Sequence, residues 1–159
     1  MWAKRTIEEL KKNGEVPEYV WKVLKAMPKT SHPMAMLDTA ILTMENESIF
    51  RKRYTEGMKK DEYWVPALQD AMRILGTIHT IAAGIYRMKF KKGPQIEPSN
   101  KLDWGADYAK MLGLPTKKGE TAAMMRLYLV LHSAHEGGNV SANPCHTVGS
   151  ALSDPYYAV

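Results

Sequence analysis

The chain has 159 residues, of which 45% are hydrophobic and 25% charged, values typical of one globular domain with its own core. Its 22 lysines and arginines outnumber 17 acidic residues, but they are scattered in ones and twos, which argues against nucleic-acid binding. No apolar run reaches the ~18 residues of a membrane-spanning helix, and the single cysteine, Cys145, excludes an intrachain disulfide and favours a reducing compartment.

The first two helices are predicted by their start and stop signals. Thr6 and Glu9 form a capping-box pair, and Asn13-Gly14 supplies a stop. Pro17 suits the first turn of a second helix, which Pro28 ends. The apolar positions of that second helix follow the i, i+3, i+4, i+7 spacing: Val20, Val23, Leu24 and Met27.

Helical spacing continues to about residue 90. A third helix is predicted from Pro33 and a fourth after Asn46–Ser48. From Asp61 the pattern predicts a fifth helix, which Gly76 separates from a sixth. No segment alternates apolar and polar residues long enough to be a strand. The predicted fold class is therefore all-α.

The second half of the chain combines a long loop with further helices. Residues 91–101, KKGPQIEPSNK, contain two prolines and a glycine and predict the longest loop. Asp103 is expected to cap a short helix that stops at Gly113. The helix predicted from about Glu120 to Glu136 is apolar on nearly all sides, which is typical of a helix buried in a large domain or at a subunit interface.

The last residues predict one more helix. Ser153-Asp154-Pro155 combines a capping residue with a proline in the first helical turn, and about one turn follows before Val159. Natural chain ends seldom fall within a first turn. We therefore expect this polypeptide to be one piece of a longer protein.

The segment HSAHEGGN, residues 132–139, contains the densest cluster of chemically versatile side chains. His132 and His135 lie three residues apart, hence on one helix face, and the glycine pair lets the chain turn sharply. Asn139 or Ser141 is then expected to cap a new helix, whose first amides are unpaired. Histidine, free amides and the positive end of a helix dipole together suit a small anion such as a carboxylate.

Three other interpretations of this cluster stay open on these residues alone. A zinc site would take its four ligands from His132, His135, Cys145 and His146. Their order matches no common zinc spacing. Cys145 beside a histidine could act as a nucleophile, a pattern that also arises by chance. The histidines could instead cap helix carbonyls or fill the core, and these structural roles are the ones expected of His32 and His79.

Longer blocks of the sequence resemble a known family. MRLYLVLHSAHEGGNVSANPCHTVGSALSDPYYAV closely resembles the central segment of citrate synthases of the eukaryotic mitochondrial type. WAKR, SHPMAMLDTAILTMENES and KLDWGADYAKMLG resemble further pieces of the same family in the same order. The resemblance covers essentially the whole chain, and HEGGNVSA and GSALSDPY are its most specific parts.

The resemblance implies a multi-helical fragment of the citrate synthase large domain, in which residues 1–159 form a single, incomplete helical region. It implies a transferase of the tricarboxylic acid cycle: a homodimer of the mitochondrial matrix that condenses oxaloacetate with acetyl-CoA and water to give citrate and CoA. Acetyl-CoA is a substrate there, and no cofactor or metal is expected. No nucleic-acid or membrane partner is expected, and the N-terminus resembles neither a signal peptide nor a transit peptide.

The family's site residues carry over only in part. In that family an aspartate removes a proton from the acetyl group, two histidines stabilise the enol and polarise the oxaloacetate carbonyl, and arginines and a further histidine hold oxaloacetate. The resemblance places this last, substrate-binding histidine at His135 and leaves His132 a structural or supporting role. The GPLHG block and the other catalytic residues lie beyond the helix that begins at Pro155, so no catalytic residue is assigned. Some relatives carry an acidic residue at the position of Ala134.

The sequence thus predicts a citrate synthase segment that is inactive alone and contacts substrate through His135. The alternative hypothesis is a non-catalytic helical module. Such a module would pair with another citrate synthase chain through its apolar helices, or bind zinc through the histidine and cysteine cluster.

Overall fold

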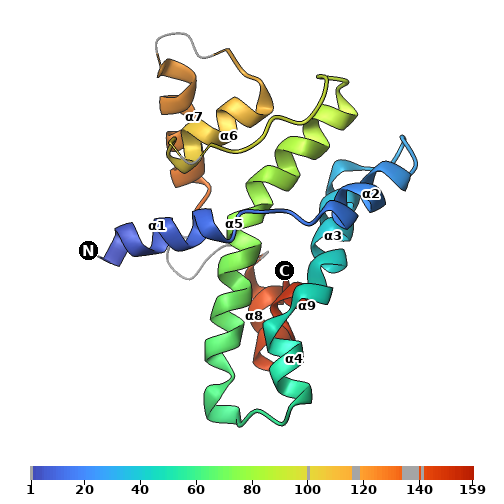
Figure 1. Ribbon diagram of the computed structural model, residues 1–159, viewed down its shortest axis with the longest axis vertical. Coiled ribbons are helices and arrows are strands. Elements are labelled where there is room, and N and C mark those ends of the chain that lie inside the picture. The colour runs from blue at the N-terminus through green and yellow to red at the C-terminus, as the bar shows by residue number, and fades with distance from the viewer. Residues whose placement is uncertain (1, 100, 116–118, 134–139, 141) are drawn as a thin grey trace.

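The computed structural model describes residues 2–99, 101–115, 119–133, 140 and 142–159. The described residues form helices joined by turns and loops and include no strand, which confirms the all-α class (Figure 1). Within these ranges, no helix is both long enough and apolar enough to cross a membrane.

The longest helix, α5 (Trp64–Lys89), forms the axis of the molecule (Figure 1). The helices that pack along it are α1 (Trp2–Lys12), α3 (Pro33–Thr43), α4 (Ile49–Thr55), α6 (Trp104–Leu112) and α9 (Pro155–Ala158). Outside this group, α2 (Glu18–Ala26) packs on α3, α7 (Glu120–Leu131) on α6, and α8 (Ala142–Ser150) on α9. The short 3-10 helices η1 (Met44–Glu47) and η2 (Lys60–Glu62) connect α3 to α4 and α4 to α5. Helices α7 and α8 are therefore attached to the axis mainly through a neighbour.

The hydrophobic core lies where α2, α3 and α9 meet α5. Its central members are Val20 and Leu24 of α2, Ile81 of α5 and Tyr156 of α9, all at most 2% exposed. Full burial of an aliphatic or aromatic side chain of this size contributes about 1.5–3 kcal/mol. The predicted apolar face of the second helix is thus the face that packs inward.

The prediction of two helices separated at Gly76 is wrong, because α5 runs through this glycine without interruption. Glycine is tolerated inside a helix where another backbone must come close. A Cβ on Gly76 would lie 2.7 Å from the carbonyl oxygen of Leu10. The glycine therefore lets α1 cross the middle of α5 at short distance (Figure 1).

The predicted helix signals have mixed outcomes. The chain is already helical at Trp2, so the Thr6 and Glu9 pair lies inside α1 and does not start it, which makes that prediction wrong. The predicted end is confirmed, since the side-chain amide of Asn13 donates to the Glu9 carbonyl at 2.9 Å. The predicted cap Asp103 is also confirmed, because its side chain accepts a backbone N–H at the start of α6. The predicted helix starts at Asn46–Ser48 and Ser153-Asp154-Pro155 are capped in the same way by Ser48 and Asp154.

The predicted loop after α5 is held by a buried arginine. The guanidinium of Arg87 donates to the carbonyls of Pro94 at 2.7 Å, Leu112 at 3.3 Å and Lys92. Leu112 ends α6, and Gly113 then adopts the left-handed conformation (φ 75°) that favours glycine. One side chain thus joins the end of α5, the loop and the end of α6.

Candidate functional site

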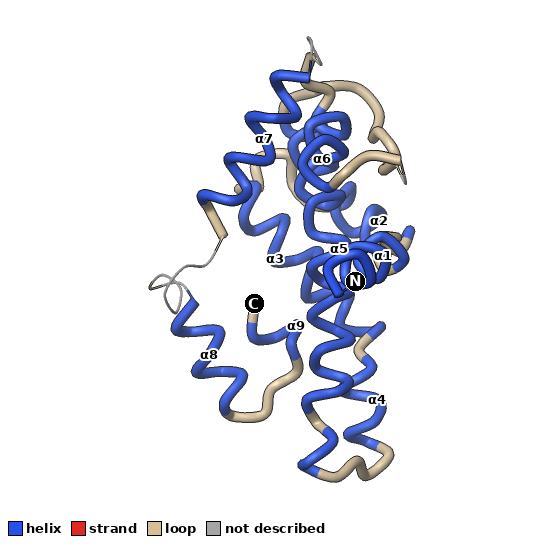
Figure 2. The backbone as a smooth tube through the Cα atoms, turned by 90° about the vertical axis from the view of Figure 1, so that its left-hand side faces the viewer, coloured by secondary structure: helices blue, strands red, loops and turns tan. Residues whose placement is uncertain are grey.

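The site predicted from the sequence lies between α7 and α8, and its main residue, His135, falls outside the described residues. The same holds for Ala134 and for the predicted caps Asn139 and Ser141. Its described part consists of the end of α7, Val140 and helix α8. Figure 2 shows α7 and α8 one after the other along the same side of the molecule. The assignment of His135 to substrate therefore stays a prediction.

His132 has a structural role at the end of α7. Its Nδ1 lies 2.8 Å from the carbonyl oxygen of Tyr128, so this nitrogen carries the proton and donates to the helix end. The imidazole also stacks on the Tyr128 ring, with 4.0 Å between ring centroids. Both contacts tie the ring to its own helix, which fits the structural role that the sequence left to His132.

His32 and His79 also have structural roles. His32 caps α3, because its Nδ1 accepts the N–H of Met34 at 3.2 Å. His79 packs edge-on against Trp104, and burial lowers the pKa of His79 to about 4. His79 is therefore neutral at pH 7 and takes no part in a cationic site.

The described residues give little support to the zinc-binding hypothesis. Among them, no group of three or more His, Cys, Asp or Glu side chains is placed to hold a metal ion. Cys145 and His146 lie on α8, where Cys145 is half-buried and His146 is exposed. The fourth ligand of the hypothesis, His135, lies outside the described ranges.

In this chain most of α7 is exposed, although its sequence predicts a helix buried in a domain or at a subunit interface. Met125 is its buried residue, and Arg126 holds the helix to α6 through a bidentate ion pair with Asp103 at 2.7 and 3.0 Å. The exposed apolar side chains, here called the α7 face, are Met124, Leu127, Tyr128, Val130 and Leu131. A contiguous apolar face of this kind is typical of a surface that another protein element covers.

A groove of about 1170 Å³ lies between α1, α5, α6 and α7. The residues that line it include Trp21, His79, Trp104 and Leu129. Three polar atoms beside it are buried without a hydrogen-bond partner: His79 Nδ1, Thr80 Oγ1 and Trp104 Nε1. His132 and Ser133, the described residues at the end of α7, do not line this groove.

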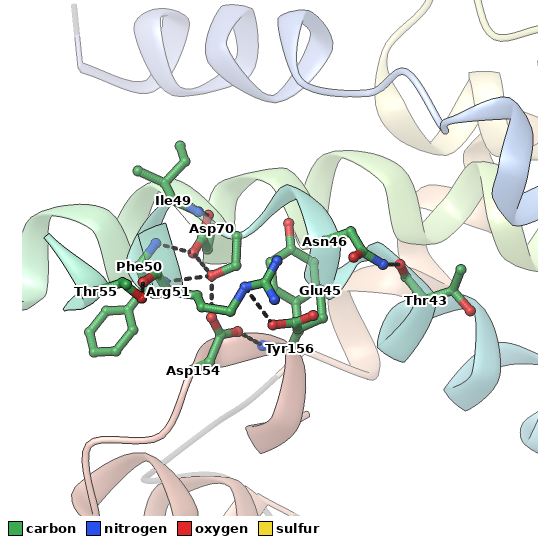
Figure 3. Close-up of polar contacts among 11 residues, drawn as sticks. Thr43, Glu45, Asn46, Ile49, Phe50, Arg51, Thr55, Asp70, Asp154 and Tyr156 are labelled. Carbon is green, nitrogen blue, oxygen red and sulfur yellow. Dashed lines mark hydrogen bonds and ion pairs between the residues drawn. The ribbon is translucent and has the colours of Figure 1, made fainter. Parts of the chain in front are cut away.

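Sequence reasoning missed a buried carboxylate cluster at the junction of α4, α5 and α9 (Figure 3). Asp70 of α5 and Asp154 before α9 both contact the hydroxyl of Ser48. Ser48 and Asp154 were recognisable as local caps. Asp70 carries no local signal, because it lies in a helix interior and its partners are 20 or more residues away.

The described residues form an all-helical assembly around one axial helix, which defines the class as a multi-helical domain. A family model described as "Citrate synthase, C-terminal domain" matches residues 3–159. The chain belongs to the citrate synthase family.

Individual relatives support the same assignment. The mitochondrial citrate synthase of Daucus carota is 42% identical over 148 residues, which are 93% of this chain and 31% of the carrot protein. The mitochondrial 2-methylcitrate synthase of Fusarium solani is also 42% identical, over 151 residues, 93% of this chain and 32% of the relative. The crystal structure of citrate synthase from Pyrobaculum aerophilum matches with a TM-score of 0.81 at 26% identity, covering 98% of this chain and 39% of that one. The chain thus spans about a third of the length of these curated relatives.

Proposed function

We propose that this chain is a segment of a citrate synthase, an enzyme that condenses oxaloacetate with acetyl-CoA and water to give citrate and CoA. The observation that carries the proposal is the family match over residues 3–159, together with the shared fold. Residues 1–159 then form one incomplete helical region of the large domain. The names of relatives such as the carrot enzyme support a mitochondrial location. Acetyl-CoA is a substrate in this proposal, and no cofactor is needed.

His135 is the proposed contact with oxaloacetate. Its place in HEGGN is that of the family's substrate-holding histidine, and α8 follows within a few residues, at Ala142. The N-terminal end of a helix favours negative charge, which suits a dicarboxylate beside an imidazole. No catalytic residue is proposed in the chain, so the isolated segment is expected to be inactive.

A second copy of the chain is the proposed partner of the α7 face. Leu127 and Leu131 are 59% and 64% exposed although they lie one helical turn apart on an apolar helix. Covering such side chains removes apolar area from water and stabilises association. The proposed assembly is a homodimer.

A segment exchange tests the proposal. The 148-residue matching segment of the carrot enzyme would be replaced by the corresponding residues of this chain, and CoA release from acetyl-CoA would be measured with oxaloacetate. The chimera is expected to form citrate, and the isolated chain is expected to form none. A chimera that is folded and assembled, as shown by circular dichroism and sizing, but forms no product would contradict the proposal.

Two additions separate related alternatives. Because the Daucus carota citrate synthase and the Fusarium solani 2-methylcitrate synthase are both 42% identical to this chain, propionyl-CoA is assayed beside acetyl-CoA, and acetyl-CoA is expected to be preferred. Metal analysis of the purified chain tests the zinc module. Stoichiometric zinc in the chain would favour that module over the enzyme segment.

A further inference from the structure

The buried cluster at the start of α4 and α9 joins parts of the chain that are far apart in sequence. Asp70 is fully buried, and its Oδ1 and Oδ2 accept the N–H groups of Ile49 at 3.0 Å and Phe50 at 2.9 Å. Asp154 is 7% exposed, and its Oδ1 accepts the N–H of Tyr156 at 2.8 Å. The Asp70 carboxyl, on α5, therefore caps the start of α4, and the Asp154 carboxyl, at the N-cap of α9, caps the start of α9 (Figure 3).

The hydroxyl of Ser48 lies between the two carboxyls. Its Oγ is 3.0 Å from Asp70 Oδ2, contacts Asp154 Oδ2 and accepts the N–H of Arg51 at 3.0 Å. A serine hydroxyl has one hydrogen to donate and two positions that accept. The single hydrogen serves one carboxyl. The contact with the other carboxyl needs a second hydrogen, which only a protonated carboxyl supplies.

The neighbouring cations do not replace this second hydrogen. Arg51 of α4 pairs with Glu45 at 2.8 Å, and Arg73 of α5 with Glu47 at 3.4 Å, so glutamates of η1 already engage both cations. The other titratable groups beside the cluster are the Tyr19 hydroxyl, which donates to Glu47, and the buried Tyr156 hydroxyl, which lies close to Asp70 and Asp154. Burial raises the pKa of Asp70, and the nearby charge of Asp154 acts in the same direction.

We propose that Asp70 and Asp154 share one proton through the Ser48 hydroxyl, and that this proton fastens α9 to α4 and α5. We call these three residues the carboxyl latch. When the shared proton is lost, two carboxylates face each other across one hydroxyl hydrogen. Asp154 has fewer hydrogen bonds to the surrounding backbone than Asp70, so Asp154 and α9 are the part that moves away.

The sign of the pH effect follows from the raised pKa. A carboxyl whose folded-state pKa exceeds the ordinary value of 3.8 holds its proton more tightly in the folded chain. The stabilisation is therefore complete below about pH 4 and is lost as the pH rises through the folded-state pKa of Asp70. One proton changes the unfolding equilibrium constant by up to about tenfold per pH unit across that window.

Two asparagine variants distinguish the latch from ordinary capping. In Asp154→Asn the carbonyl still accepts the Tyr156 N–H, while the amide group donates permanently to Ser48 and replaces the shared proton. In Asp70→Asn the amide nitrogen cannot accept the Phe50 N–H, so this variant loses stability at every pH. Asp38→Asn, on the exposed side of α3, is the matched control.

The test is urea unfolding of the whole chain and the three variants between pH 4 and pH 9, together with carbon-13 titration of the aspartate carboxyls. The unfolding constant of the unmodified chain is expected to rise with pH relative to Asp154→Asn, and Asp38→Asn is expected to follow the unmodified chain. The carboxyl of Asp70 is expected to retain its proton above its ordinary pKa of 3.8. Parallel pH profiles for the unmodified chain and Asp154→Asn would overturn the proposal. Complete ionisation of the Asp70 carboxyl near pH 4 would overturn it even if the variants failed to fold.

Discussion

Gly84 of α5 faces the ring of Trp21, which packs against the core. A Cβ at this position would lie 2.5 and 2.7 Å from ring atoms Cζ3 and Cη2. We expect Gly84→Ala to lower the free energy of unfolding by about 1–3 kcal/mol, because overpacking outweighs the gain in helix propensity. Urea unfolding of the purified chain measures the change.

Gly149→Ala is the matched control, because a Cβ there meets nothing within 4 Å in α8. It keeps the gain in helix propensity, up to about 1 kcal/mol, without the collision. A similar loss of stability in both variants would show that the ring of Trp21 is not the cause.

At the scale of single residues, roles that depend on sequence neighbours were predictable, and roles that depend on distant parts of the chain were not. Capping depends on neighbours within a few residues, so the cap Asp103 and the helix starts that Ser48 and Asp154 cap were predictable. Gly76 was misread as a break because the reason for it is the backbone of α1, about 66 residues earlier in the chain. Asp70 gave no signal at all for a similar reason. The role of His135 came from a family motif and stays a prediction.

At the scale of elements, α7 is attached to α6 by an ion pair that low pH should weaken. Side-chain hydrogen bonds from Arg126 lower the pKa of Asp103 to about 2. Because the folded-state pKa lies below 3.8, this contribution to stability is present above pH 4 and is lost as the pH falls through about 2. Half of each side chain is exposed, so solvent and salt screen the pair and the contribution is small.

Asp103→Asn tests this attachment, since asparagine keeps the cap of α6 and removes only the charge. We expect the variant to be slightly less stable than the unmodified chain at pH 7 and low salt. The difference should vanish towards pH 2 and in high salt, as followed by thermal unfolding. A difference that is the same at pH 7 and pH 2 would argue against the ion pair.

The pattern of α7 also shows where sequence reasoning about elements stops. An apolar helix was predicted to be buried, and its composition is correct for burial, but within this chain only its Met125 side packs inward. The sequence of an element indicates which face is covered. It does not indicate whether the covering element belongs to the same chain.

For the whole molecule, the α7 face predicts self-association. Leu127→Glu places a charge on that face, where Leu127 is 59% exposed, so the fold of a single chain should tolerate it. We expect the variant to shift the chain from dimer towards monomer in sedimentation velocity. Ile7→Glu, on an equally exposed apolar position of α1, should leave the association unchanged. If both variants associate as strongly as the unmodified chain does, the α7 face is not part of the proposed dimer interface.

The central claim is that His135 holds a carboxylate of oxaloacetate. Its most direct test is the oxaloacetate dependence of the carrot chimera with His135→Ala, beside His146→Ala as control. Loss of one charge-assisted hydrogen bond of about 1.5–3 kcal/mol predicts a kcat/KM for oxaloacetate that falls roughly ten- to a hundredfold, with the control unchanged. Unchanged KM and kcat in the His135→Ala chimera would contradict the claim.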